Sequence, residues 1–350
     1  MDDSRAGILF AAQFSGSAFG ALFVGNDFFG SLMRGYLLLI ASTVSLSLFT
    51  GLFQVILFLS FGLGLGLTMT ATSLLICSIA SGKRGAALAL LNASWAVGAV
   101  LCPAIASLWI SRWSPTYLFA ILAVAFAVTA LLIGKHRAAF AVGDSNPPKI
   151  KGEQRQFKLL LIFATLAFLY VGVEVSVSGW MMTYVHRMRI TSNLWPPIAT
   201  SGFWIALLCG RALAPAVLQQ LSEGQLFTSS LTIAFTSTLL LLLSHSPMAI
   251  VFFATFAGLT LGPIFPLCLA RVLCITNDSP KTKWVFAIAG LGGAFFPWMT
   301  GQISAYNASL RAGLVVPVFA LGAMIILHRL ELTGHFCIVG IKQAPDTTGT

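Results

Sequence analysis

The sequence predicts an all-α membrane protein, a polytopic bundle of about eleven transmembrane helices arranged as two related halves. Three observations support this class. The 350 residues are 57% hydrophobic and 9% charged, whereas soluble domains carry roughly 25% charged residues. The apolar residues form uncharged runs of about 20 residues, the length that crosses a bilayer. Two patterns of glycine and proline occur once in each half, in the same order.

Five spans are expected ahead of one extended polar stretch. The chain starts with an acidic segment rather than the basic start of a signal peptide, so the first apolar stretch is predicted to remain as a span. The uncharged run Gly35–Ser81 is too long for one crossing, and basic residues flank both of its ends. It therefore holds two crossings that turn near Thr50-Gly51, the first of them short. The expected segments are Ala6–Gly25, the two crossings within Gly35–Ser81, Ala86–Leu108 and Pro115–Gly134.

Six further spans are expected after the polar stretch. That stretch, residues 135–158, contains Asp144-Ser145-Asn146-Pro147-Pro148 and has the composition of a linker. The six segments are Leu159–Tyr184, Pro196–Leu218, Leu226–Leu243, Met248–Ala270, Trp284–Ala305 and Ala312–Leu327. The predicted organisation is thus an N-terminal bundle over residues 1–134, the linker 135–158, a C-terminal bundle over 159–328 and a tail over 329–350.

The basic residues predict the orientation. Alternating crossings place 15 of the 20 Lys and Arg residues on the side of the linker and tail. The other side receives Arg5, Arg112, Arg187, Arg189 and Arg311. Since the basic side of a membrane protein faces the cytoplasm, we expect a multi-pass protein of the inner (plasma) membrane with a cytoplasmic C-terminus and an external N-terminus. The net charge of +10 therefore reflects topology in a lipid bilayer and does not indicate nucleic acid.

The sequence offers no pattern for a metal, a cofactor or an enzyme active site. The six cysteines fall mostly inside apolar runs without metal-ligand spacing, and the five histidines are dispersed. There is no phosphate-binding loop of the Gly-x4-Gly-Lys-Ser/Thr type, and no Gly-x-Ser-x-Gly. We therefore expect neither ATP-driven transport nor hydrolysis.

The two halves share two local patterns. Gly62-Leu63-Gly64-Leu65-Gly66 precedes a basic loop, and Gly258-Leu259-Thr260-Leu261-Gly262 precedes another, 196 residues later. The following span carries Gly98-x4-Pro103 in the first half and Gly292-x4-Pro297 in the second, 194 residues later. Glycines at this spacing let helices approach closely, and a proline inside a span is tolerated where neighbouring helices cover it. Two matches at nearly the same offset predict a duplicated bundle, which is a transporter architecture.

Motifs along nearly the whole chain resemble the major facilitator superfamily, and within it the fucose-permease-like sugar:proton symporters. The segments that carry the resemblance are Gly85 to Asn92 running into Gly98…Pro103, Tyr170-Val-Gly-Val-Glu174…Trp180, Gly210-Arg211, Gly258…Pro266, and Gly292-Gly293…Pro297-Trp298…Gly301. The resemblance implies secondary transport of a small polar solute, a sugar, with protons, by alternating access of a monomer.

The chain departs from that family in three ways. Ala6–Gly25 matches the family's second span, so a first span has no counterpart here. The loop after it, where the family has Asp-Arg-x-Gly-Arg, keeps Asp27 and Gly30 but has neither arginine, which weakens the inward gate that the motif implies. The family's proton-coupling carboxylates would fall on that first span and on the Leu52–Ala80 span, which has no acidic residue.

Glu174 is the main candidate for substrate binding or proton coupling, because it is the only Asp or Glu inside an expected span. A carboxylate in hydrocarbon costs several kcal/mol, so it should face a wet cavity or be protonated. Its distance from Lys158 places it in the outer half of the membrane. Tyr170 and Ser178 share its helical stripe at four-residue spacing. A structural carboxylate bonded to a neighbouring helix remains the alternative.

Five further side chains are weaker candidates. Trp180 would face the cavity if the helix breaks near Ser178-Gly179, and would otherwise be an interfacial aromatic. Gln13, Asn92 and Trp204 could contact substrate or a neighbouring helix. Arg211 is expected at the cytoplasmic end of its span, as a gate, as an anchor or paired with Glu223.

Two other functions stay open. The same fold could export an amphipathic compound through a phenylalanine-lined cavity, for which 28 Phe residues are available. The chain could also be a relic or a solute sensor without transport, an interpretation that the unmatched first span suggests.

Overall fold

The structure, a computed structural model, describes residues 2–49, 51, 53–79, 84–135, 137, 153–188, 194–276 and 282–333. Within these ranges every regular element is a helix, which confirms the all-α class. The helices are α1 (Asp3–Leu22), α2 (Phe28–Leu48), α3 (Phe53–Ile79), α4 (Arg84–Ile110), α5 (Pro115–Lys135), α6 (Glu153–Arg187), α7 (Trp195–Val217), α8 (Glu223–Leu243), α9 (Pro247–Leu261), α10 (Ile264–Thr276), α11 (Thr282–Asn307), α12 (Leu310–Gly313) and α13 (Val315–Thr333).

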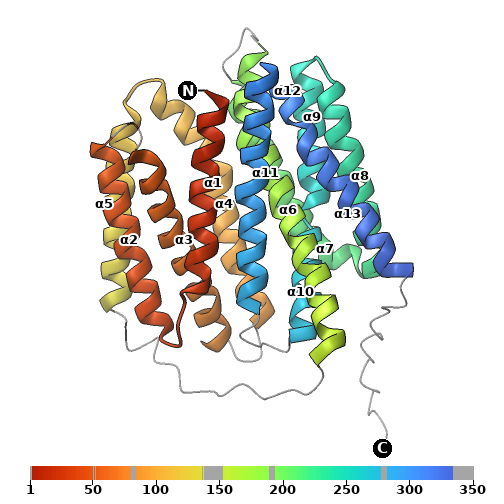
Figure 1. The fold of residues 1–350 in the computed structure, drawn as a ribbon, viewed down its shortest axis with the longest axis horizontal. Coiled ribbons are helices and arrows are strands. Elements are labelled where there is room, and N and C mark those ends of the chain that lie inside the picture. The colour runs from red at the N-terminus through yellow and green to blue at the C-terminus, as the bar shows by residue number, and fades with distance from the viewer. Residues whose placement is uncertain are drawn as a thin grey trace, which may run out of the picture.

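The long helices lie side by side in one bundle (Figure 1). Helices α2, α3 and α5 lie at one edge, α8, α9 and α13 at the other, and α1, α6 and α11 between them. We call the end where α5 ends and α6 begins the linker end, and the end where α1 begins and α6 ends the far end. Most of the predicted linker, and the predicted tail beyond Thr333, lie outside the described residues.

Ten segments of the described chain are long and apolar enough to cross a membrane, which agrees with the predicted bundle. Helix α1 is not among them, because Gln13 and several serines and glycines interrupt its apolar residues. Helix α1 nevertheless packs along α3 and α11 and lies in the bundle beside the ten apolar segments.

The glycine pattern shared by the halves has the same packing role in each. A Cβ at Gly62 or Gly66 of α3 would overlap backbone carbonyl oxygens of α1. A Cβ at Gly258 or Gly262 would likewise overlap carbonyl oxygens of α7. The backbones of each helix pair are therefore in contact, as the small residues predict.

Four pairs of packed helices repeat between the halves. Helix α1 packs on α3 as α7 packs on α9, and α2 packs on α3 as α8 packs on α9. Helix α2 packs on α5 as α8 packs on α13, and the contact of α1 with α11 has its counterpart in that of α7 with α4. This correspondence supports the predicted pseudo-symmetry.

One predicted span boundary was wrong. Helix α2 starts at Phe28 and not at Gly35, because Asp27 caps it: Asp27 Oδ1 accepts from the Gly30 N–H at 2.8 Å. The following turn near Gly51 has the left-handed φ of +91° that favours glycine. The span predicted over Met248–Ala270 is confirmed as the single apolar segment Pro247–Leu269. Within it the helix is interrupted at Gly262-Pro263, between α9 and α10, since proline cannot donate the next backbone hydrogen bond.

Candidate substrate and proton site

The predicted stripe on α6 meets a cation from α7 in the interior of the bundle. Nη2 of Arg211 lies 3.4 Å from Oε2 of Glu174 and 3.4 Å from the hydroxyl oxygen of Tyr170. Tyr170 and Glu174 are one helical turn apart, so one guanidinium nitrogen reaches both. The result is a carboxylate, a guanidinium and a phenol in one cluster, which we call the α6–α7 cluster.

The α6–α7 cluster is buried but loosely bonded. Tyr170 is fully buried, Glu174 is 7% exposed, and the Arg211 side chain is 15% exposed. Distances of 3.4 Å exceed the usual N–H···O range of 2.7–3.2 Å. Nε of Arg211 is buried and has no hydrogen-bond partner among the described residues. The cation therefore keeps donor capacity that a polar ligand could use.

Glu174 lies at the middle of its apolar segment. That segment runs from Leu160 to Arg187, so Glu174 is 14 residues from one end and 13 from the other. The prediction of the outer half counted 16 residues from Lys158, whereas the apolar segment continues past the predicted end at Tyr184 to Arg187 and has Glu174 at its centre. Helix α6 is 35 residues long and extends beyond the hydrocarbon thickness of about 30 Å.

Arg211 was predicted as a gate, as an anchor at the cytoplasmic end of its span or as a partner of Glu223, and the structure gives it a different partner. Helix α7 continues past it to Val217, and its side chain turns inward to Glu174. Glu223, the partner considered for Arg211, instead lies 3.8 Å from Arg271. The physical reason is burial: a carboxylate and a guanidinium removed from water are more stable together than apart.

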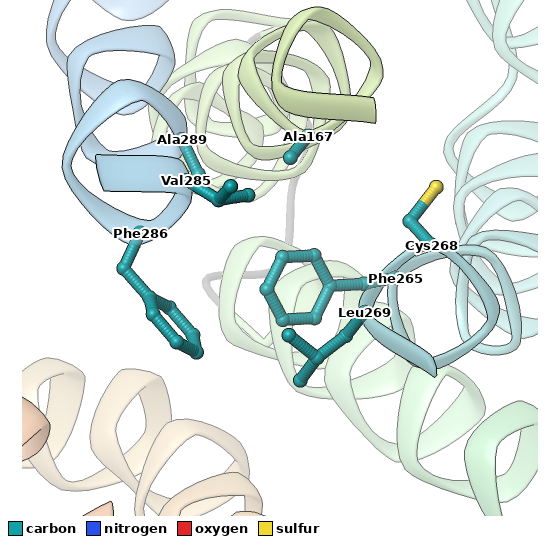
Figure 2. Close-up of a pocket in the computed structure, with 7 residues that line it drawn as sticks. All are labelled: Ala167, Phe265, Cys268, Leu269, Val285, Phe286 and Ala289. Carbon is teal, nitrogen blue, oxygen red and sulfur yellow. The ribbon is translucent and has the colours of Figure 1, made fainter. Parts of the chain in front are cut away.

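An aromatic side chain covers the cluster on the linker side. Phe265, just after the break between α9 and α10, stacks on Tyr170 with ring centroids 5.5 Å apart. Beyond it, Figure 2 shows the Phe265 ring projecting into a small apolar cavity between α6, α10 and α11, with Ala167 and Val285 on its walls. The cavity holds about 10 Å³, room for roughly one water molecule. Phe265 was not predicted, since a phenylalanine after Pro263 carries no distinguishing signal.

Trp180 packs between helices of the bundle. Helix α6 is continuous through Ser178-Gly179, so the predicted break does not occur. The Trp180 side chain is 2% exposed, its Nε1–H donates to the Pro297 carbonyl at 3.1 Å, and its ring packs on Phe10. The Ser178 hydroxyl donates to the Glu174 carbonyl of its own helix at 2.7 Å. These bonds satisfy both side chains within the protein.

Trp204 contacts the first half of the chain. It lies seven residues before Arg211 and therefore on the same face of α7. Its ring meets that of Trp95 of α4 edge-on, with centroids 5.3 Å apart. Trp95 was not singled out in the sequence, although a tryptophan among small residues in a span was an available signal.

Gln13 and Asn92 are not brought to the α6–α7 cluster. The Gln13 backbone packs against Gly62 of α3, and Asn92 is exposed on α4. No hydrogen bond of either side chain is found within the described residues. Their predicted contact with substrate therefore stays a prediction.

The residues predicted for gating or helix packing divide into four groups. Asp27 and Gly30 form the α2 cap, and a Cβ at Gly30 would overlap the Asp27 carboxylate. Gly292 lies against the Phe168 carbonyl of α6, as the close-approach prediction requires. A Cβ at Gly98 would have no described atom within 4 Å, so its predicted contact is not found. Pro103 and Pro297 lie inside α4 and α11.

The halves are joined by polar contacts at the far end. The Arg187 guanidinium binds the Asp3 carboxylate with two hydrogen bonds, one of them 2.6 Å from Nη1 to Oδ2, and the Ser304 hydroxyl donates to the same carboxylate. The Ser4 hydroxyl donates to Gln302 Oε1 at 3.0 Å. We call this set the far-end clasp. The sequence analysis did not predict this clasp, because Asp3 and Arg187 are 184 residues apart and no local pattern links them. They reach the same end of the bundle only through the order in which the helices cross.

A family model described as Major Facilitator Superfamily matches residues 1–274. The chain belongs to the major facilitator superfamily. The fold agrees: the structure superimposes on a mutant of the peptide transporter POT in complex with sulfate with a TM-score of 0.74 and 12% identity, covering 95% of this chain and 85% of that one. A variant of the E. coli fucose:proton symporter FucP gives a TM-score of 0.65 at 14% identity, covering 93% and 90% of the two chains.

Two curated relatives of this superfamily member are sugar transporters. The glucose/mannose transporter GlcP of Bacillus subtilis (strain 168) is 26% identical over 157 residues, 43% of this chain and 37% of that protein. A glucose/galactose transporter of Brucella abortus biovar 1 (strain 9-941) is 23% identical over 197 residues, 53% of this chain and 46% of that protein. The matches thus span less than half the length of either relative.

Proposed function

We propose that this superfamily member is a secondary transporter that moves a small polar solute, a sugar, across the membrane together with protons. The observation that carries the proposal is the α6–α7 cluster: a carboxylate at the middle of a membrane span, paired with a cation that keeps a buried, unpartnered donor. Ionisable groups inside a membrane mark substrate or proton pathways, because they are too costly to keep without a role. The two relatives named as glucose transporters support a sugar as the solute.

The α6–α7 cluster suggests how proton and sugar binding are coupled. With Glu174 ionised, Arg211 is held by the carboxylate and by Tyr170. A proton on Glu174 removes that charge and frees the guanidinium to donate to sugar hydroxyl oxygens. The two ligands then favour each other by linkage, since each binds more tightly when the other is present. Returning the empty carrier requires Glu174 to lose its proton and pair again with Arg211.

Alternating access requires one end of the bundle to close while the other opens. We infer from the distribution of Lys and Arg that the linker end faces the cytoplasm and the far end faces outward. The far-end clasp then corresponds to a closed outer side. Its buried carboxylate and bidentate arginine make it stronger than a neutral contact.

Purified chain in proteoliposomes tests the proposal. With a pH gradient, acidic outside, we expect uptake of labelled glucose, galactose, mannose or fucose that a protonophore abolishes. Uptake of a lipophilic cation, with no sugar transported, would indicate the efflux alternative. Sugar binding in detergent without any uptake would indicate a sensor.

Asp3→Asn should open the far end. The substitution replaces the charge-assisted pair with Arg187 by a neutral one and should weaken the clasp by about 1–3 kcal/mol. We expect a cysteine placed at Thr300, a buried residue one turn from Ser304 on α11, to react with an external maleimide roughly five- to a hundredfold faster in this variant, in line with that energy. Asp2→Asn is the matched control, and equal labelling rates in the two variants would show that the clasp is not a gate.

The far-end clasp should not respond to physiological pH. Burial alone would raise the pKa of Asp3, but hydrogen bonds from Arg187 and Ser304 and the arginine charge hold it below its usual value of 3.8. A lowered pKa means that the clasp is fully formed above 3.8 and is lost only as the pH falls through the lowered value. The ratio of the labelling rates at the Thr300 cysteine with and without Asp3→Asn cancels the ionisation of the thiol itself. This ratio should therefore stay constant from about pH 8 to pH 5, and any pH dependence of transport in that range must arise at another group.

A further inference from the structure

An open groove runs over α3 between α1 and α2 in the first half of the bundle. Helices α1 and α2 both pack on α3 rather than on each other, and Figure 1 shows α3 between them. The groove encloses about 460 Å³, a volume in the range of ligand-binding pockets. Its lining residues are Phe23, Arg34, Leu37, Leu38, Leu63 and Leu67.

The walls of this groove suit a hydrocarbon chain. All its lining side chains except that of Arg34 are apolar. Leu67 of α3 forms a buried floor, whereas Phe23 and Leu37 at the rims are 65% and 63% exposed. The lining residues of α2 and α3 lie inside apolar segments that are long enough to cross a membrane. At that depth the surroundings are lipid, so the occupant of the groove must itself be apolar over most of its length.

Arg34 gives the groove one fixed cation. Among the lining residues of α2 it lies nearest the linker end, where α2 begins. Its Nε donates to the Gly30 carbonyl at 3.1 Å and its Nη2 to the Ser31 hydroxyl at 3.2 Å, so the side chain turns back toward the start of its own helix. Three of its five N–H donors remain, and no carboxylate pairs with it in the part of the chain that the structure describes. A guanidinium with free donors in this fork matches a phosphate group.

The equivalent groove of the second half has no such cation. Helix α2 corresponds to α8 in the repeat, and each begins at a residue whose side chain caps it. Counted from these N-caps, Arg34 of α2 corresponds to Ser229 of α8, and Leu37 corresponds to Thr232. The Ser229 hydroxyl donates within its own helix at 3.1 Å. The cation is therefore a property of one groove and not of the repeated fold.

We propose that this groove binds one anionic phospholipid of the leaflet at the linker end, with its phosphate on Arg34 and an acyl chain over Leu63 and Leu67. Basic residues between membrane helices near the cytoplasmic surface attract anionic headgroups. A net negative headgroup, that of phosphatidylglycerol, fits better than a zwitterionic one, because Arg34 brings a charge that no carboxylate balances. The Asp27 carboxylate, two turns away on α2, is engaged as the helix cap. The inference goes beyond the proposed sugar transport and does not depend on it.

Site-specific photo-cross-linking to lipid tests the proposal. The full chain carries a benzoylphenylalanine at Leu37 and is reconstituted in phosphatidylcholine vesicles with a minor share of phosphatidylglycerol. After illumination, mass spectrometry counts the adducts of each lipid. We expect phosphatidylglycerol adducts to exceed their share of the bilayer about fivefold, the ratio that corresponds to one arginine acting on an anionic headgroup. The matched probe at Thr232, at the equivalent place in the second half, should give adducts in proportion to the bilayer composition.

Arg34→Gln should remove the enrichment at Leu37, because the amide is neutral. Arg137→Gln is the control, since Arg137 also lies at the linker end but its guanidinium is 5.5 Å from the centroid of the Phe29 ring and does not line the groove. It should leave the enrichment unchanged.

Four outcomes would overturn the proposal: no enrichment at Leu37, equal enrichment at Thr232, enrichment that survives Arg34→Gln, or equal enrichment when phosphatidylethanolamine replaces phosphatidylglycerol. None of these measurements uses sugar uptake, so failure here and failure of the proposed function are distinguishable.

Discussion

Replacing Glu174 by Gln is expected to abolish proton-driven accumulation of the sugar while leaving passive exchange intact. The amide has the shape of the protonated carboxyl group and cannot release a proton. Arg211 would then stay available to the sugar, but no proton would cross the membrane together with the sugar. In proteoliposomes, a gradient of one pH unit is worth about 1.36 kcal/mol and supports about tenfold accumulation at one proton per sugar. We expect that ratio to fall to about one in the variant.

The control for this experiment is Glu223→Gln, which removes the carboxylate that is half exposed at the linker end. It should accumulate sugar as the unmodified chain does. Counterflow of labelled sugar against a preloaded pool, without a pH gradient, must survive in Glu174→Gln for the interpretation to hold. Accumulation undiminished in Glu174→Gln would show that the coupling group lies elsewhere and that Glu174 is a structural carboxylate.

Replacing Arg211 by Met is expected to cause the largest loss of stability of any single change in the α6–α7 cluster. It leaves the Glu174 carboxylate buried without its cation, which costs about 3–5 kcal/mol in comparable buried pairs. The melting temperature of the purified protein should fall by roughly 5 °C, and sugar binding should be lost with the guanidinium donors.

The double variant Arg211→Met/Glu174→Gln separates the ion pair from packing. With the carboxylate also removed, most of the lost stability should return, because the remaining groups are neutral. Sugar binding should not return, since the donors remain absent. A double variant no more stable than Arg211→Met would mean that the pair contributes nothing and that the arginine stem acts through packing alone. Glu223→Gln, at an exposed pair, should change the stability by less than about 1 kcal/mol.

Some features were readable from short stretches of sequence. The long uncharged runs specified most helices, because only a helix can satisfy its backbone inside a bilayer. The glycines around Gly62 and Gly258 specified close backbone contact, since a side chain there would prevent it. Glu174 was identifiable as a candidate because a carboxylate in a span is rare and costly.

Other features depend on which faces meet, and short stretches do not contain that information. The sequence allowed Arg211 to be a terminal anchor. Only the packing of α7 on α6 makes Glu174 its partner. Similarly, Asp3 and Arg187 each look like ordinary terminal charges until the start of α1 and the end of α6 meet at the far end.

By itself the sequence determined the class, the helices, the duplicated bundle and the membrane carboxylate, because hydropathy and residue size act locally along each span. The tertiary structure alone decided the partner of that carboxylate, the continuity of α6 through Ser178-Gly179 and the contrast between Gly98 and Gly292. These three features depend on long-range packing, in which residues far apart in the chain form ion pairs and van der Waals contacts with one another.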